Sequence, residues 1–151
     1  MKPIDDTKIR EVNIELENRF KNEREEWKDK IITLVKSIGD TRKLSEAQIQ
    51  QLSFRQIVQE KLAEYRILQE KRQEIYDKQY TSRFREYHTG YDLKLSNTEK
   101  NIFVQSDCSA IKSQIKMISV QITYFEECVK TLDNLGFAIK NKIEIVSQQL
   151  M

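Results

Sequence analysis

The chain contains almost no residues that interrupt a helix. Its 151 residues include a single proline, Pro3, and three glycines, Gly39, Gly90 and Gly136. Beyond Pro3 every residue keeps its backbone donor, so helices can extend over many turns. The widely spaced glycines predict punctuation between long helices. We therefore expect an all-α protein.

Apolar residues in the first part of the chain recur at spacings of three, four and seven, as on one helical face. The first series consists of Ile9, Val12, Leu16, Phe20, Trp27, Ile31, Leu34 and Ile38. Gly39 and Asp40 follow it, which predicts that residues 1–44 form an N-terminal amphipathic helix.

A second series predicts one long helix in residues 45–95, ending near His88 in a basic and aromatic segment. Its members are Phe54, Val58, Leu62, Tyr65, Leu68, Ile75, Tyr80, Phe84 and Tyr87. Ser45 and Gln48 in "SEAQ" have the spacing of a capping box, with Ser45 as the N-cap. A pattern of this length is typical of a coiled coil or an elongated subunit.

The most regular pattern lies in residues 96–151, after a second capping box formed by Ser96 and Glu99 in "SNTE". Apolar residues then alternate at spacings of four and three from Val104 to Gly136. This repeat predicts a supercoiled helix, which needs a partner along its length, and Gly136 is expected to end or kink it. A short C-terminal helix is expected to follow.

The apolar faces of these helices are longer than the other helices of one chain can easily cover, so we expect self-assembly. Isoleucine at both core positions of the heptad favours more than two strands. The fold predicted is one domain of three to four long helices in antiparallel hairpins with heptad seams. The residues predicted to build the oligomer are Ile111, Ile115, Ile118, Ile122, Phe125, Val129, Leu132, Phe137, Ile139, Ile143, Val146 and Leu150.

The motifs of catalysis are missing from the sequence. It holds one histidine, His88, no glycine-rich phosphate loop, no dinucleotide fingerprint and no paired-cysteine motif. Helix-face combinations of carboxylate and histidine that hold metals are missing too. We expect a protein that is not an enzyme and that uses no cofactor or metal.

The cysteines and the hydropathy of the chain indicate in which cellular compartment the protein is expected. Cys108 and Cys128 lie in one predicted helix, about 30 Å apart by helical rise, too far for a disulfide within the chain. No apolar run approaches the roughly 20 residues that span a bilayer, and the N-terminus does not resemble a signal peptide. We expect a cytoplasmic protein without a membrane partner.

The segment "SRFREYHTGYDLK", residues 82–94, gathers cations and rings where the second helical pattern stops. Cations neutralise phosphates and aromatic faces stack on bases, so the segment is a candidate for binding single-stranded nucleic acid. The alternative is packing, since Tyr80, Phe84 and Tyr87 continue the apolar stripe. Tyr91 is the ring that packing explains least. The candidate DNA-binding residues are Lys71, Arg72, Lys78, Arg83, Arg85, Tyr87, His88, Tyr91 and Lys94.

Three stretches of the chain form a pattern in their order and spacing: "EEWKDK" around Trp27, "YTSRFREYHTGYDLKLS" at residues 80–96 and "LDNLGFAIKNKIE" at 132–144. Together they resemble the UvsY-type recombination mediators of T-even-like bacteriophages. The family's basic DNA-binding motif falls over residues 82–85, where Arg83 and Arg85 supply the positive charge.

The resemblance implies a ring-like homo-oligomer that binds single-stranded DNA. It further implies loading of a RecA-type recombinase onto DNA coated with single-strand-binding protein, in phage recombination, repair and recombination-dependent replication within the host cytoplasm. A ring would also multiply the modest net charge of +2 per chain. The alternative is a structural coiled-coil scaffold or adaptor that does not bind nucleic acid.

Overall fold

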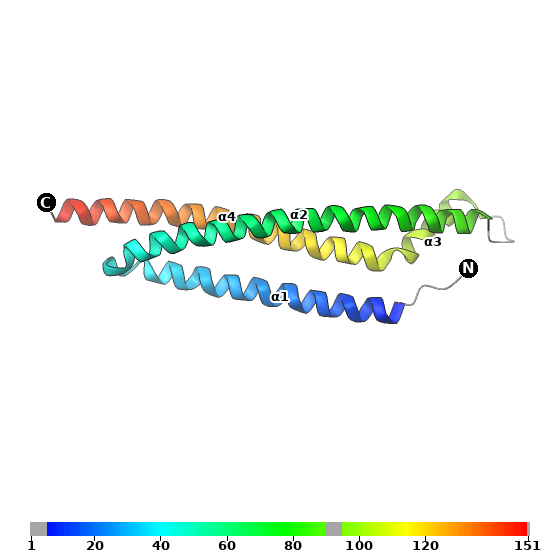
Figure 1. Ribbon diagram of the computed structural model, residues 1–151, viewed down its shortest axis with the longest axis horizontal. Helices are drawn as coiled ribbons and strands as arrows, with labels where there is room; N and C mark the ends of the chain where they lie inside the picture. The colour runs from blue at the N-terminus through cyan, green and yellow to red at the C-terminus, as the bar shows by residue number, and fades with distance from the viewer. Residues whose placement is uncertain (1–5, 90–94, 151) are drawn as a thin grey trace. The chain divides into compact units, whose positions relative to one another are not determined.

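The computed structural model describes residues 6–89 and 95–150, and in these ranges the chain is helical, with no strand. The elements are α1 (Asp6–Ser37), the 3-10 turn η1 (Thr41–Lys43), α2 (Leu44–Thr89), α3 (Asn97–Asp107) and α4 (Ser109–Gln149). Figure 1 follows them along the chain, from α1 in blue to the end of α4 in red. The all-α prediction is confirmed.

The helix ends confirm one predicted cap and correct another. Ser96 is the N-cap of α3, and its hydroxyl accepts a hydrogen bond from the Glu99 backbone N–H at 3.1 Å. Ser45 is not a cap, because η1 leads directly into α2 and places Ser45 in the first turn of that helix. The capping side chain here is Asp40, which accepts from the Arg42 N–H. Hydrogen bonds from Arg42 hold the pKa of Asp40 below its usual value.

The predicted heptad helix is divided at a different place from the one expected. Cys108, with φ −96° and ψ 7°, separates α3 from α4. Beyond it α4 continues through Gly136 to Gln149, so a separate short C-terminal helix is wrong. Gly136 lies close to α2: a Cβ at this position would lie 2.8 Å from Nε2 of Gln51, so the end of that side chain would have to shift.

The described residues belong to two compact units, each formed by stretches that are distant in sequence. Unit 1 takes in residues 1–20 and 66–120, and unit 2 takes in residues 21–65 and 121–151. Each of the helices α1, α2 and α4 contributes a segment to both units.

The core of unit 2 is centred on Trp27, which is only 2% exposed. Its indole ring meets Phe54 of α2 and Phe125 of α4 edge-on, with ring centroids 5.4 and 6.3 Å away. Tyr65 of α2 stacks on Phe125, with ring centroids 5.8 Å apart. Edge-to-face pairs add stability beyond the area that they bury. The predicted apolar stripes of three helices therefore meet at Trp27.

Polar side chains align the helices of unit 2 around this core. The Glu23 carboxylate of α1 accepts hydrogen bonds from Lys61 and Tyr65 of α2 and from Gln121 of α4. The buried Gln51 amide donates to the Leu132 carbonyl at 2.9 Å. Because buried donors must find acceptors, these bonds favour one register over others.

None of the described helices is both long enough and apolar enough to cross a membrane.

Gly136→Ala tests the close approach of α2 and α4. Alanine stabilises a helix by about 1 kcal/mol relative to glycine. Displacement of Gln51 breaks its hydrogen bond to the Leu132 carbonyl, which costs about 1 kcal/mol. We expect little net change in the free energy of unfolding in the wild-type background. In a Gln51→Ala background the collision is absent, and Gly136→Ala should stabilise by about 1 kcal/mol. Urea denaturation of the four proteins measures this, and equal effects in both backgrounds would contradict the contact.

Candidate nucleic-acid interface

The second half of α2 carries an aromatic series that packs inside unit 1. Tyr76, Tyr80 and Phe84 pack against a buried cluster that includes Val104 and Cys108. Centroids of successive rings lie 6.0 and 6.4 Å apart, and the second pair is stacked. This is the packing alternative that the spacing of the stripe predicts.

Tyr87 belongs to the same cluster, which corrects its expected role as a stacking ring. The residue is 7% exposed, and its ring stacks on Phe103 of α3 with centroids 5.7 Å apart. Its hydroxyl donates to the Asp107 carboxylate at 2.7 Å. With one face on Phe103 and its hydroxyl engaged, Tyr87 cannot also receive a base.

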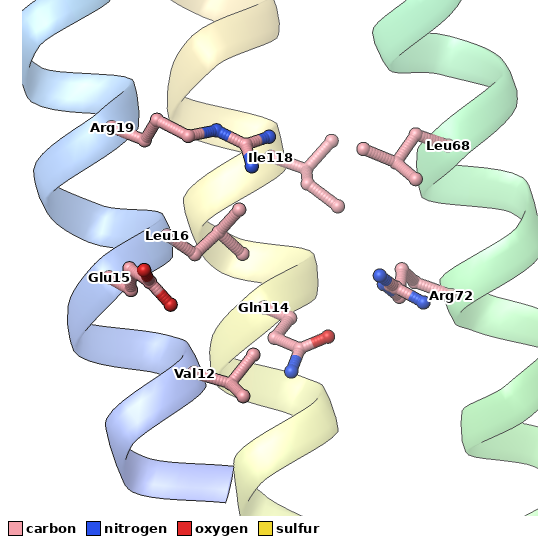
Figure 2. A pocket seen from close by; sticks show the side chains of 8 residues that line it. All are labelled: Val12, Glu15, Leu16, Arg19, Leu68, Arg72, Gln114 and Ile118. Carbon is pink, nitrogen blue, oxygen red and sulfur yellow. The ribbon is translucent and has the colours of Figure 1, made fainter.

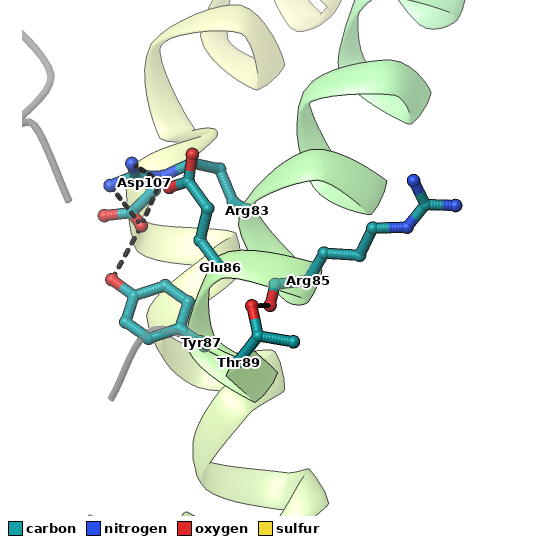
Figure 3. Close-up of polar contacts among 6 residues, drawn as sticks. All are labelled: Arg83, Arg85, Glu86, Tyr87, Thr89 and Asp107. Atoms are coloured by element: carbon teal, nitrogen blue, oxygen red, sulfur yellow. Dashed lines mark hydrogen bonds and ion pairs between the residues drawn. The ribbon is translucent and has the colours of Figure 1, made fainter. Parts of the chain in front are cut away.

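Arg83 is held by carboxylates of its own chain, which corrects its expected role as a phosphate ligand. Its Nε and Nη2 lie 3.0 and 2.9 Å from Asp107 Oδ2, and its Nη1 lies 2.8 Å from Glu86 (Figure 3). Only 13% of the side chain is exposed. Although burial opposes the charge, hydrogen bonding and proximity to Asp107 and Glu86 raise the pKa of Arg83 above its usual value.

Three exposed cations occupy one face of α2 at intervals of seven residues. They are Lys71, Lys78 and Arg85, here called the cationic ridge. None of the three forms an ion pair with another residue in ranges 6–89 and 95–150. In Figure 3 the Arg85 side chain extends away from the cluster of Arg83, Glu86 and Asp107. Seven residues are almost two full turns, so the cations recur about every 10 Å along one line.

A shallow depression of about 540 Å³ accompanies the ridge. Its described lining residues all come from α2 and are Asp77, Lys78, Thr81, Ser82, Arg85, Glu86 and Thr89. The hydroxyls of Thr81 and Thr89 donate to backbone carbonyls one turn earlier. The depression therefore combines two ridge cations with two carboxylates and small hydroxyl side chains, and one of the carboxylates, Glu86, is paired with Arg83.

The remaining candidates have different surroundings. His88 is exposed, and its Nδ1 lies 2.9 Å from Nζ of Lys100, a buried lysine of α3. Arg72 is half-buried and faces a cavity described below. Tyr91 and Lys94 lie outside the described residues.

Lys100 and Asp107 anchor α3 to the end of α2, and neither was predicted from the sequence. Lys100 stands four residues before Val104, in an apolar position of the repeat, and its ammonium lies 5.9 Å from the Phe84 ring. A lysine in a core position is a signal that could have drawn attention to it. Asp107 carries no such signal, because its partners lie 20 and 24 residues earlier in the chain.

The residues predicted to build the oligomer fall into three groups. Five are buried by their own chain and are therefore not available to a second copy, which corrects their expected role: Ile118, Ile122, Phe125, Leu132 and Ile139. Five are half-buried: Ile111, Ile115, Val129, Ile143 and Val146. Phe137 and Leu150 are 68% and 83% exposed. Residues Ile49 and Leu52 of α2, which were not predicted, are also exposed.

Neither cysteine is disulfide-bonded, and both are buried. Burial raises the pKa of the Cys108 and Cys128 thiols above its usual value, so their thiolate forms are disfavoured. In the part of the chain that the structure describes, no three His, Cys, Asp or Glu side chains form a group that could hold a metal ion.

No protein-family model, curated protein or solved structure matches the chain. An interface is therefore inferred from the contacts, burial and charges of this chain.

Asp107→Asn tests the anchoring role of this carboxylate. The change weakens charged hydrogen bonds from Arg83 and Tyr87 in a largely buried setting, so we expect the free energy of unfolding to fall by about 1.5–3 kcal/mol. The matched control is Asp133→Asn, because the Arg55–Asp133 pair is about 40% exposed on both sides. Exposed pairs contribute at most about 1 kcal/mol. Equal losses of unfolding free energy for the two variants in urea denaturation would contradict the assignment.

Proposed function

We propose that this chain is a non-enzymatic, homo-oligomeric protein that binds single-stranded DNA and acts as a recombination mediator. In this role it helps to load a RecA-type recombinase onto DNA coated with single-strand-binding protein. The observation that carries the DNA-binding part is the cationic ridge of Lys71, Lys78 and Arg85, exposed and without ion pairs among the described residues. The mediator role is supported by the resemblance of residues 80–96 and 132–144 to that family.

The ridge suits a flexible polyanion. A strand lying along α2 meets a cation about every 10 Å, and each neutralised phosphate releases counterions. Three contacts in one chain give weak binding, whereas several copies in one assembly raise the effective concentration of sites. The acid Glu74 lies on the same face of α2 between Lys71 and Lys78, so affinity per chain stays low. Weak, repeated contacts are consistent with a protein that holds a strand and then hands it over.

The residue roles in this proposal differ from those expected from the sequence. Lys78 and Arg85 contact phosphates, with Lys71 extending the line. Arg83 and Tyr87 do not contact DNA in this proposal. They bind Asp107 of α3 and so hold the end of α2 in place within unit 1. Tyr91 remains the proposed stacking ring, and Lys94 remains a proposed DNA contact.

We propose further that the helices pair as antiparallel hairpins and that copies assemble into a ring. Within unit 2 Trp27 meets Phe54, whereas the earlier residue Glu23 meets the later residue Lys61, which is consistent with α1 and α2 running in opposite directions. Exposed apolar side chains of unit 2 supply the contact between copies, and they are Ile49, Leu52, Phe137, Ile145 and Leu150. Burying such a side chain is worth about 1.5–3 kcal/mol, which favours association.

Fluorescence anisotropy tests the proposed function. Labelled oligo-dT and a duplex of the same length are titrated with protein at low and high salt. We expect preference for the single strand and a steep loss of affinity as salt rises. Failure to bind oligo-dT at low salt would contradict DNA binding altogether.

Neutralising the ridge should weaken binding without unfolding the protein. For Lys78→Gln with Arg85→Gln we expect lower oligo-dT affinity and a salt slope reduced by about 0.7 for each lost phosphate contact. The control is Lys28→Gln with Lys36→Gln, which removes the same charge from exposed positions of α1 in unit 2. Similar losses in the two double variants would show that overall charge, and not the ridge, governs binding.

The second candidate is a structural coiled-coil scaffold or adaptor, and the exposed apolar side chains of unit 2 favour it as well. It predicts the same assembly without salt-dependent binding of DNA. The anisotropy titration therefore separates it from the first candidate.

Leu52→Glu with Phe137→Glu tests the surface used for assembly. Leu52 and Phe137 are 59% and 68% exposed and line one groove, so charges there should leave unit 2 folded and lower the mass of the assembly. Light scattering gives the mass and circular dichroism the helicity. The comparison variant is Ile102→Glu, an equally exposed apolar residue of α3. An unchanged mass for the double variant would exclude this surface.

A further inference from the structure

Unit 1 contains a cavity of about 360 Å³ between α1, α2 and α4 (Figure 2). Its lining residues are Val12, Glu15, Leu16, Arg19, Leu68, Arg72, Gln114 and Ile118. This volume is within the range of small-molecule sites. Four of the lining residues are apolar and four are polar or charged, and the exposed residues Val12, Glu15 and Arg19 open the cavity to solvent on the side of α1.

Arg72 brings an unsatisfied charge to this cavity. Its Nε is buried and has no hydrogen-bond partner in the part of the chain that the structure describes. In Figure 2 its guanidinium lies beside α2, in the space between α2 and α4. A guanidinium stays charged at all ordinary pH values, and a buried N–H without an acceptor is costly. The site therefore calls for an acceptor, and an anionic oxygen is the strongest kind.

The other polar groups limit what the acceptor can be. Gln114 is buried, and its Nε2 donates to Asn13 Oδ1 at 2.8 Å, which fixes the orientation of the amide. Its oxygen then faces the side of the cavity from which Arg72 enters (Figure 2). Arg19 reaches across from α1, and Glu15 is the only acid of the lining. The lining thus carries two guanidinium groups and one carboxylate, a net charge of +1.

The apolar part of the lining offers room for a compact body attached to the anion. Leu16 comes from α1, Leu68 from α2 and Ile118 from α4, and they stand together above Gln114 in Figure 2. A flat ring can lie against such branched side chains, while an amide oxygen accepts a hydrogen bond from a ring N–H.

We propose that this cavity binds one nucleotide-sized phosphate ester. The guanidinium of Arg72 donates to the phosphate, Arg19 adds charge, and the base lies against Leu16, Leu68 and Ile118. The choice of a nucleotide rests on the proposed DNA-binding function. The ligand's source is either one unit of a bound strand or a free mononucleotide.

Calorimetric titration of the full-length chain with dTMP, thymidine and inorganic phosphate tests the site. We expect dTMP to bind with one site per chain and more tightly than thymidine or phosphate alone. Arg72→Gln should weaken dTMP binding roughly tenfold to one-hundredfold, because a charge-assisted hydrogen bond is lost. Arg10→Gln is the matched control, since it removes an exposed arginine of unit 1 that lies outside both the cavity lining and the cationic ridge, and it should leave dTMP affinity unchanged. No binding of dTMP in the millimolar range, or equal binding to wild type and Arg72→Gln, overturns the proposal.

A second variant tests the cavity independently, in case Arg72→Gln does not fold. Leu68→Phe narrows the cavity and keeps both arginines, so it should also reduce dTMP binding while circular dichroism stays unchanged. Normal dTMP affinity in a folded Leu68→Phe protein counts against the site.

Two comparisons separate this proposal from the DNA-binding function. If dTMP fails to bind but oligo-dT binds through Lys78 and Arg85, the cavity site falls and the proposed function stands. If dTMP binds through Arg72 but oligo-dT does not bind, the cavity site stands alone as a mononucleotide site. Competition of oligo-dT with dTMP identifies the strand as the source, and simultaneous binding identifies the free nucleotide.

Discussion

The Asp107 carboxylate determines what the end of α2 can offer to a ligand. It receives hydrogen bonds from Arg83 and Tyr87 at the point where the chain turns from α3 into α4. Asp107 thereby keeps the Arg83 guanidinium and the Tyr87 ring from the surface. These bonds also fix the orientation of α2 about its own axis. The faces of α2 that remain outside are then determined by helical periodicity. Lys71, Lys78 and Arg85 share one of these faces because seven residues nearly complete two turns.

Much of the fold could be predicted from the sequence, because apolar periodicity reports directly on which side of a helix is buried. Trp27, Val58 and Leu132 lie on predicted stripes and are buried. The Ser96 cap was predictable too, because it depends on four consecutive residues. The break at Cys108 was not, since the spacing of four and three passes through it unchanged. The close approach of Gly136 to Gln51 was not predictable either, because Gln51 lies in another helix and a local pattern does not include it.

Contacts between helices also decide which residues of the candidate site are exposed, and a local sequence pattern does not show them. Arg83 and Arg85 are equivalent in a local reading of "SRFREY", yet one is bound by two carboxylates and the other is exposed. The difference comes from tertiary partners and from a rotation of 200° between positions two residues apart, about half a turn of helix. Tyr87 was predicted both as a core residue of the apolar stripe and as a ring that binds DNA, and in the structure it is buried. Arg72 was expected among the DNA-binding residues and faces a cavity instead.

The central claim is that a single strand lies along the exposed face of the second half of α2. Photo-crosslinking tests this most directly, with oligo-dT that carries photoreactive thymine analogues and mass spectrometry of the crosslinked peptides. The account predicts crosslinks concentrated in residues 71–94, reduced by high salt and by neutralisation of the cationic ridge. Crosslinks confined to residues 21–65 or 121–149 would contradict it, because they would place the strand on unit 2.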